Sequence, residues 1–128
     1  MKVIVVDVDG TICPKKTPEQ DYADLPVFPD MVEKLRDLKA DGWRIIMHTS
    51  RNMRSFKNSV GEINAKTLPV LIKWLEKHDV PFDEIHVGKP WCGHEGFYID
   101  DRAIRPSEFR DLSMDEIGEL LEAERRDS

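Results

Sequence analysis

The chain has 128 residues, of which 40% are hydrophobic and 34% charged, and its formal net charge is −6. This composition is typical of a globular protein, and the length predicts one domain over 1–128. The acidic balance argues against broad binding to nucleic acid or to an anionic membrane surface. No apolar run approaches the roughly 20 residues of a membrane span, and the first ten residues lack the pattern of a signal peptide. We therefore expect a cytoplasmic protein without membrane partners.

Two cysteines, Cys13 and Cys92, are too few for a disulfide framework and indicate a reducing compartment. Cys92 and His94 together raise the question of a zinc site. Zinc sites are usually built from four protein or solvent ligands. Cys13 is the only other thiol, and a second Cys/His pair is absent from the sequence. A zinc site is therefore not expected.

Four short apolar stretches have the composition of buried strands, and they cover residues 3–6, 43–48, 85–87 and 97–99. Amphipathic segments alternate with them or follow them. The segment 30–41 has helical spacing and is stopped by Gly42. The segment 64–78 is also helical, and Pro69 predicts that its regular part begins near Thr67. A capping box from Ser113 to Glu116 opens a C-terminal helix that is predicted over 113–126.

This alternation predicts an α/β fold, with a doubly wound, mostly parallel sheet and helices on both faces. In such sheets, ligands bind at the carboxyl ends of the strands. Polar residues suited to phosphate and metal chemistry follow every predicted strand. They are Asp7 and Asp9 after the first, Thr49, Ser50 and Arg51 after the second, Lys89 after the third, and Asp100 and Asp101 after the fourth.

The order of these motifs resembles that of the haloacid dehalogenase (HAD) superfamily of phosphohydrolases. Asp7-Val-Asp9-Gly10-Thr11 matches the first motif, Thr49 the second, Lys89 the third and Asp100-Asp101 the fourth. The DxDGT motif is specific, whereas the Thr and the Lys gain weight from their order and spacing. The resemblance covers nearly the whole chain and implies a HAD-like Rossmannoid fold with phosphatase activity.

The resemblance implies that Asp7 is a nucleophile, which would attack a phosphomonoester and form an aspartyl phosphate. Asp9 lies on the same side as Asp7 in an extended chain. It would protonate the leaving alcohol and then deprotonate the water that hydrolyses the intermediate. The resemblance also implies Mg²⁺, a hard cation with oxygen ligands from Asp7, the backbone carbonyl of Asp9 and Asp100, with Asp101 as a further candidate.

The phosphate is expected to bind among several of the motif residues. Lys89 would supply a fixed positive charge for the phosphate and for Asp7. Thr49 would donate its hydroxyl to a phosphate oxygen, assisted by backbone N–H groups near Thr11 and Ser50. Gly10 would let the backbone turn sharply away from the strand.

The sequence leaves little room for the cap domain that many HAD phosphatases carry. Residues 11–29 allow only a flap-like insertion, and residues 51–88 are filled by a loop, one helix and one strand. A capless site is open to solvent. It must accept large substrates or receive a lid from another subunit, which makes a homo-oligomer a candidate arrangement.

Longer stretches resemble a narrower group, the HAD phosphatases associated with capsular polysaccharide biosynthesis. The resemblance is carried by Thr49–Arg54, Val60–Asn64 with Leu68-Pro69, Gly88–His94 and Phe97–Pro106. It implies that the substrate is a phosphorylated sugar or polyol. Two other readings remain open. One is a polynucleotide-end or nucleotide phosphatase, which the net charge disfavours; the other is a non-catalytic HAD-fold binding protein.

Four residues near the motifs are candidates for substrate contacts. Arg51 and Arg54 could bind a second anionic group of the substrate, or they could equally be surface arginines paired with acids. Trp91 and His94 could line the substrate entrance, where a Trp ring would stack on a sugar face. In the alternative, Trp91 packs under its own loop.

Overall fold

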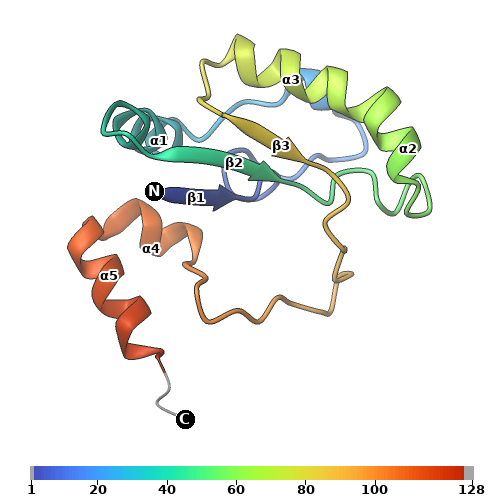
Figure 1. Cartoon of the computed structure of the whole chain (residues 1–128). Helices are drawn as coiled ribbons and strands as arrows, with labels where there is room; N and C mark the ends of the chain where they lie inside the picture. Colours follow the sequence, from blue (N-terminus) through green and yellow to red (C-terminus); the bar gives the residue numbers. More distant parts are fainter. Residues whose placement is uncertain (1, 126–128) are drawn as a thin grey trace. The chain divides into compact units, whose positions relative to one another are not determined.

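The computed structural model describes residues 2–125, and the chain divides into two compact units, residues 1–91 and 92–128. Figure 1 labels the strands and the α-helices of both units. The first unit contains β1 (Val3–Val6), the 3-10 helix η1 (Tyr22–Asp24), α1 (Pro29–Ala40), β2 (Arg44–His48), α2 (Val60–Glu62), the π-helix η2 (Ile63–Thr67), α3 (Leu68–Lys77) and β3 (Glu84–His86). The second unit contains α4 (Pro106–Asp111) and α5 (Met114–Ala123). The prediction of one domain over 1–128 stays a prediction.

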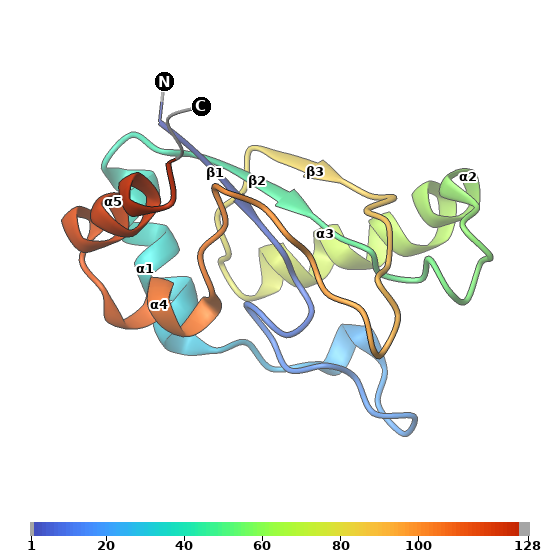
Figure 2. The ribbon, with the colours of Figure 1, turned by 90° about the horizontal axis from the view of Figure 1, so that it is seen from below.

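The three strands form a parallel sheet in the order β1-β2-β3, seen side by side in Figure 2. Val5 of β1 pairs with Ile46 of β2, and Ile46 in turn pairs with Glu84 of β3. β2 is therefore the central strand, and within residues 2–125 β1 and β3 each pair with a strand on one side only. The predicted strands 3–6, 43–48 and 85–87 are confirmed to within one residue at each end. An α/β fold with a parallel sheet flanked by helices is confirmed as well.

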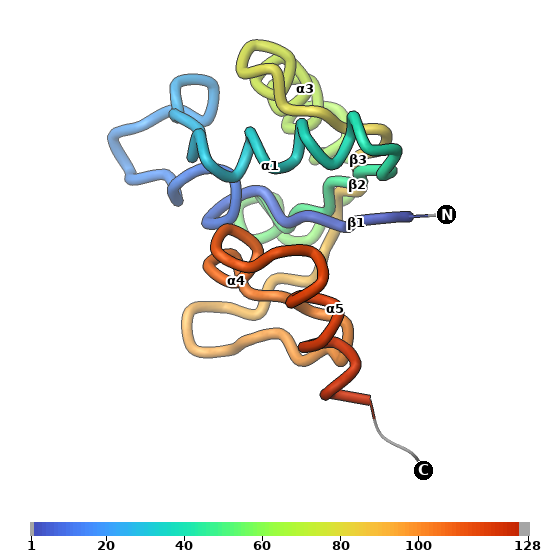
Figure 3. The backbone as a smooth tube through the Cα atoms, turned by 90° about the vertical axis from the view of Figure 1, so that its left-hand side faces the viewer, coloured from blue at the N-terminus to red at the C-terminus, as the bar shows by residue number. Residues whose placement is uncertain are grey.

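One face of this sheet is covered by α1 and α3. Figures 1 and 3 show both helices on the same side of the strands. Side chains alternate along a strand, so Val6, Ile45 and Met47 point to that side and are buried. The helices add buried residues of their own, which are Met31, Val32, Leu35 and Leu38 from α1 and Leu71, Trp74 and Leu75 from α3. This apolar layer is the core of the first unit.

The helix α1 begins and ends as the sequence predicts. Pro29 stands in its first turn, where a missing N–H has no consequence. The helix ends at Ala40, and Gly42 follows with φ +92°, a conformation that favours glycine. The amide of Trp43 then donates to the carbonyl of Leu38 at 3.0 Å, which closes the helix end.

Pro69 shapes the helical stretch from α2 to α3. Its ring would clash with the carbonyl four residues earlier in a regular α-helix. The preceding turn is instead the π-helix Ile63–Thr67, in which the amide of Leu68 donates to the carbonyl of Ile63. The wider turn accommodates the proline. The regular helix α3 therefore begins at Leu68, next to the predicted start, while the helical stretch as a whole already begins at Val60.

In the second unit, the prediction of a strand at residues 97–99 is wrong. Phe97, Tyr98 and Ile99 have no strand conformation and are 76%, 51% and 89% exposed. A strand is defined by its pairing, and within residues 2–125 only β1, β2 and β3 form a sheet. The predicted C-terminal helix is present as α5, with the capping box of Ser113 and Glu116. Its predicted last residue, 126, lies outside the described residues.

The described chain contains no cap domain, as predicted. Between β1 and α1, residues 7–28 contain only the short helix η1 as regular secondary structure. Between β2 and β3 lie a loop and the helical stretch from α2 to α3. Over residues 2–125, no helix combines the length and the apolar character that crossing a membrane requires.

Candidate active site

Asp7 lies at the carboxyl end of β1 between a hydroxyl and an ammonium group. The hydroxyl of Thr11 donates to Asp7 Oδ2 at 3.2 Å, and Lys89 Nζ lies 3.5 Å from Asp7 Oδ1. The Asp7 side chain is 33% exposed, so the carboxylate is held in place and still accessible from solvent. Asp7, Thr11 and Lys89 all belong to the first unit, and the structure brings these three predicted site residues together.

The turn after β1 depends on Gly10. Its φ is +87°, and a Cβ there would lie 3.3 Å from the Lys15 side chain. The Gly10 amide donates to the carbonyl of Cys13 at 2.8 Å, and the amide of Thr11 donates to Val8 at 3.1 Å. The side chains of Val8 and Ile12 are fully buried and anchor the turn in the core. This anchoring places the Thr11 hydroxyl beside Asp7.

Thr49 joins the end of β2 to the loop that carries Lys89. Its amide donates to the carbonyl of His86 at 3.0 Å, and its carbonyl accepts from the amide of Lys89 at 3.2 Å. Its hydroxyl oxygen accepts from the amide of Arg51 at 3.0 Å. A hydroxyl that accepts one bond still has a proton to donate. Thr49, although buried, therefore remains suited to the predicted hydrogen bond to phosphate.

Asp9 is held by a buried arginine, a contact that the sequence did not predict. Arg51 Nε donates to Asp9 Oδ2 at 3.1 Å, and Arg51 Nη2 donates to Asp9 Oδ1 at 2.8 Å. The arginine side chain is only 1% exposed, whereas that of Asp9 is 22% exposed. The guanidinium carbon lies 4.1 Å from the centre of the Tyr22 ring. The sequence left open whether Arg51 binds the substrate or is a surface arginine paired with an acid; it is paired with an acid, but it is buried.

Two further groups near the site are held neutral. Cys13 is buried, and its thiol contacts Asp9 Oδ1 at 3.6 Å; burial first, and then the charge of Asp9, raises the pKa of the thiol to about 12. His48 ends β2, and burial, followed by the nearby charges of Lys89 and His86, lowers its pKa below 6.5. Both shifts favour the neutral form, of the Cys13 thiol and of the His48 ring.

The remaining predicted substrate residues divide between the two units. In the first unit, the Arg54 guanidinium lies 5.7 Å from the centre of the Trp91 ring, a cation–π contact. Trp91 is partly exposed, as a residue at a substrate entrance would be. Ser50 is half-buried after β2. His94 is exposed in the second unit. The predicted substrate contacts of these residues stay predictions.

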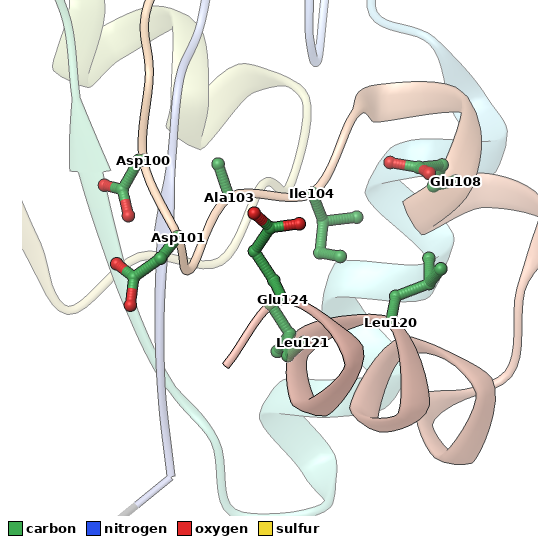
Figure 4. Close-up of a pocket in the computed structure, with 8 residues that line it drawn as sticks. All are labelled: Asp100, Asp101, Ala103, Ile104, Glu108, Leu120, Leu121 and Glu124. Atoms are coloured by element: carbon green, nitrogen blue, oxygen red, sulfur yellow. The ribbon is translucent and has the colours of Figure 1, made fainter. Parts of the chain in front are cut away.

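The two acids of the fourth motif also lie in the second unit. Asp100 accepts a hydrogen bond from the amide of Arg102 at 2.8 Å. Asp100 and Asp101 both line a pocket of about 170 Å³, drawn in Figure 4, together with Glu108, Glu124 and the apolar residues Ala103, Ile104, Leu120 and Leu121. Within residues 2–125, no three His, Cys, Asp or Glu side chains gather closely enough to hold a metal ion.

The donor groups of the first unit nevertheless fit part of a magnesium site. Mg²⁺ prefers oxygen ligands, and the accessible carboxylate of Asp7 offers one. Both oxygens of the Asp9 side chain are engaged by Arg51, so the predicted contribution of Asp9 through its backbone carbonyl fits better than one through its carboxylate. The parts of Asp100 and Asp101 in a metal site stay predictions.

Comparison with known proteins first defines the class of fold. The chain is similar to a D,D-heptose 1.7-bisphosphate phosphatase from B. bronchiseptica that was crystallised with magnesium and phosphate, with a TM-score of 0.50 and 18% sequence identity. The match covers 76% of this chain and 54% of that one. The chain therefore has an α/β fold similar to that of this phosphatase.

A second comparison gives the family. A crystal structure of a Vibrio cholerae protein, described only as an MCSG target, is 50% identical and has a TM-score of 0.92, and the match covers 98% of this chain and 100% of that one. The chain belongs to the same family as this Vibrio cholerae protein. No protein-family model matches the chain, and a search of curated proteins found no match either.

Proposed function

We propose that the protein is a Mg²⁺-dependent phosphomonoesterase that works through an aspartyl phosphate at Asp7. The observation that carries the proposal is the setting of Asp7 after β1, accessible and flanked by the Thr11 hydroxyl at 3.2 Å and by Lys89 Nζ at 3.5 Å. An anionic nucleophile that approaches an anionic phosphate needs such a positive charge beside it. The specific DxDGT motif and the fold support the same reaction.

The proposed reaction has two displacements. In the first, a carboxylate oxygen of Asp7 attacks the phosphorus, the bond from phosphorus to the leaving oxygen breaks, and Asp9 gives that oxygen a proton. In the second, water attacks the phosphorus, Asp9 takes a proton from the water, and the bond to Asp7 breaks. Lys89 offsets the negative charge in both steps, and Thr49, Ser50 and the amide near Thr11 would hold the phosphate oxygens.

Mg²⁺ would be held by Asp7, the backbone carbonyl of Asp9 and Asp100, with Asp101 as a further candidate. When bound, it would polarise the phosphoryl group and offset its charge. A chelator should therefore abolish phosphate release, and added Mg²⁺ should restore it. The check is a titration of the chelator-treated protein with Mg²⁺, followed by release of inorganic phosphate; full activity without any divalent cation would contradict the metal requirement.

The proposed substrate is a phosphorylated sugar or polyol, in capsule or surface polysaccharide biosynthesis. The sequence resemblance supports this class, and the B. bronchiseptica neighbour is itself named for a sugar phosphate. Arg54, Trp91 and His94 are the proposed contacts to the sugar portion. We also propose that the protein is cytoplasmic, binds neither nucleic acid nor a membrane, and forms a homo-oligomer that could supply a lid. A panel of sugar, sugar-acid, polyol and nucleotide phosphates tests the substrate class.

The assignment of the nucleophile is tested by Asp7→Asn. Release of p-nitrophenol from p-nitrophenyl phosphate with Mg²⁺ should fall on the order of 10³-fold or more, since the variant has lost its nucleophile. Asp37→Asn is the matched control, because Asp37 is an exposed acid of α1. Asp7→Asn with wild-type activity would refute the assignment. Absence of turnover by the wild type across the whole panel would favour a binding protein instead.

A further inference from the structure

We infer that Arg51 is a positioning residue for Asp9, which it holds in one orientation for proton transfer to and from the substrate. This inference rests on the proposed function, because it gives Asp9 the role of acid and base. The arginine itself need not touch the substrate. Its guanidinium affects the reaction by binding the Asp9 carboxylate.

The contact has the geometry of a two-point clamp. Two N–H groups of Arg51 meet the two oxygens of Asp9 at 3.1 and 2.8 Å. A guanidinium and a carboxylate that pair in this way are coplanar and cannot rotate independently. A lysine in the same place would offer a single charge without this restriction. The clamp therefore fixes the plane of the Asp9 carboxylate and not only its charge.

Arg51 is itself restrained by aromatic rings and by the backbone of its loop. Its guanidinium stacks on the Tyr22 ring at 4.1 Å and lies 6.0 Å from the Trp74 ring. Its amide is bonded to the Thr49 hydroxyl. The next residue, Asn52, has a φ of +63° and accepts a hydrogen bond from the Thr67 hydroxyl at 2.7 Å. The loop backbone and the aromatic rings thus restrain the arginine, which can then restrain Asp9.

The burial of Arg51 is difficult to explain by stability alone. Its third nitrogen, Nη1, is buried without a hydrogen-bond partner in the described structure. Burying an arginine with an unsatisfied N–H is unfavourable, and a buried ion pair is often no more stabilising than apolar residues of the same size. Local departures from ideal bonding and backbone geometry, here with Asn52 at positive φ, concentrate at functional sites. These features favour a role in the reaction.

The clamp also determines where the proton can lie. Each oxygen of Asp9 accepts one N–H from Arg51, and Oδ1 also accepts from the Cys13 thiol at 3.6 Å, so the lone-pair direction that stays open is on Oδ2. A proton on Asp9 must therefore occupy a direction that points away from the guanidinium. When Asp9 gives this proton to the leaving oxygen, the carboxylate that remains is stabilised by the guanidinium; when water later attacks, the same position receives a proton.

The alternative is that Arg51 only ties two loops together, and leaving-group dependence separates the two roles. Alkyl phosphates need an acid for their poor leaving group, whereas p-nitrophenyl phosphate does not. We compare both esters in the wild type, Arg51→Met, Arg51→Lys and Asp9→Asn. The matched control is Arg110→Met, because Arg110 is an exposed arginine of α4 that pairs with its neighbour Asp111.

The rate to compare is that of the first phosphoryl transfer, measured as the leaving alcohol released in a single turnover, because the later hydrolysis of the aspartyl phosphate is common to both esters. If Arg51 positions Asp9, Arg51→Met should lower this rate on the order of 100-fold for the alkyl ester, the range of acid catalysis, but only a few-fold for the aryl ester. Asp9→Asn should show the same selectivity, and combining it with Arg51→Met should add little. Arg51→Lys keeps the positive charge and is therefore expected to disturb folding less than Arg51→Met does. Its rate should still fall more with the alkyl ester than with the aryl ester. Equal losses for both esters in Arg51→Lys, or losses that multiply in the double variant, would overturn the inference.

The outcome also distinguishes the inference from the proposed function. A wild-type chain that hydrolyses both esters, with variants that lose activity uniformly, contradicts only the positioning role. A wild-type chain that hydrolyses neither ester contradicts the proposed function, and the positioning role fails with it. Circular dichroism of each variant verifies that it is folded before its rates are compared.

Discussion

At the scale of single residues, the two aspartates after β1 have different surroundings. Asp7 is accessible and lies near Thr11 and Lys89, which suits a nucleophile that must reach a phosphate. Asp9 is clamped by Arg51 and touched by the Cys13 thiol, which suits a group that must keep one orientation. The two carboxylates are separated by a single residue, and their different environments fit the different tasks proposed for them.

The cysteines should differ sharply in reactivity. The thiolate is the reactive form of cysteine, and burial together with the charge of Asp9 raises the pKa of Cys13 to about 12. We expect iodoacetamide at pH 8 to modify Cys92, which is partly accessible, and to leave Cys13 unmodified until the protein unfolds. Mass spectrometry of tryptic peptides measures both sites. Rapid labelling of Cys13 in the folded Cys92→Ser variant would contradict the buried, neutral thiol.

The sequence contains enough information to predict part of the site. The DxDGT motif identifies Asp7 and Asp9, and the order of the motifs identifies Lys89, which the structure does place beside Asp7. The pairing of Asp9 with Arg51 could not be predicted, because the two residues are 42 positions apart and an arginine after a strand is equally typical of an anion-binding residue. Side-chain pairing across loops depends on how the whole unit folds.

At the scale of elements, strong local sequence patterns predicted the strands and helices correctly. The β-branched run at 3–6 is β1, and the capping box at Ser113 begins α5. The stretch 97–99 has the same kind of apolar composition but is not a strand. A short strand gains most of its stability from its neighbours, so composition alone cannot decide whether it forms. The π-turn before Pro69 was also not predicted, because it is a local response to the missing amide.

The strand β2 should make stability depend on pH through His48. Burial, and then the charges of Lys89 and His86, lowers its pKa from 6.5, so the folded state binds a proton less readily than the unfolded state does. The stability contributed by neutral His48 is complete above pH 6.5 and is lost as the pH falls through the lowered pKa. Urea unfolding at several pH values should show this decline. His48→Gln should flatten it, and an unchanged decline would contradict the assignment.

The packing of α3 against the sheet should be sensitive to cavities. Leu71 is fully buried between the helix and the core. Leu71→Ala should lower the free energy of unfolding by about 2–5 kcal/mol, because both the apolar contacts and the filled volume are lost. Val70→Ala is the matched control, since Val70 is exposed on the same helix. Urea unfolding measures both variants, and equal losses would contradict the placement of α3.

At the scale of the whole molecule, β1 is an edge strand of the three-stranded sheet that the described residues form. β1 pairs with β2 on one side only, and Val5 at this edge is 60% exposed. Open apolar edge strands readily pair with another chain. This edge supports the proposed homo-oligomer without determining its form.

The oligomer proposal predicts a solution mass above the 14.8 kDa of one chain. Val5→Lys should shift the mass toward the monomer, because a lysine on an edge strand opposes pairing. Light scattering coupled to gel filtration measures both proteins. Glu33→Ala, a change on an exposed position of α1 that alters the net charge by the same amount as Val5→Lys, controls for altered surface charge. A wild-type protein that elutes as a monomer at high concentration would contradict the proposal.

The central claim is that phosphate is transferred to Asp7. Asp9→Asn should form the aspartyl phosphate from p-nitrophenyl phosphate but hydrolyse it slowly, because the base that activates water is missing. Acid quenching followed by mass spectrometry of the peptide that contains residues 3–12 should then show one phosphoryl group on Asp7, removable with hydroxylamine. The same peptide should remain unmodified when Asp7→Asn is added. Phosphate release without any label on Asp7, or a label that persists in the Asp7→Asn background, would contradict the account.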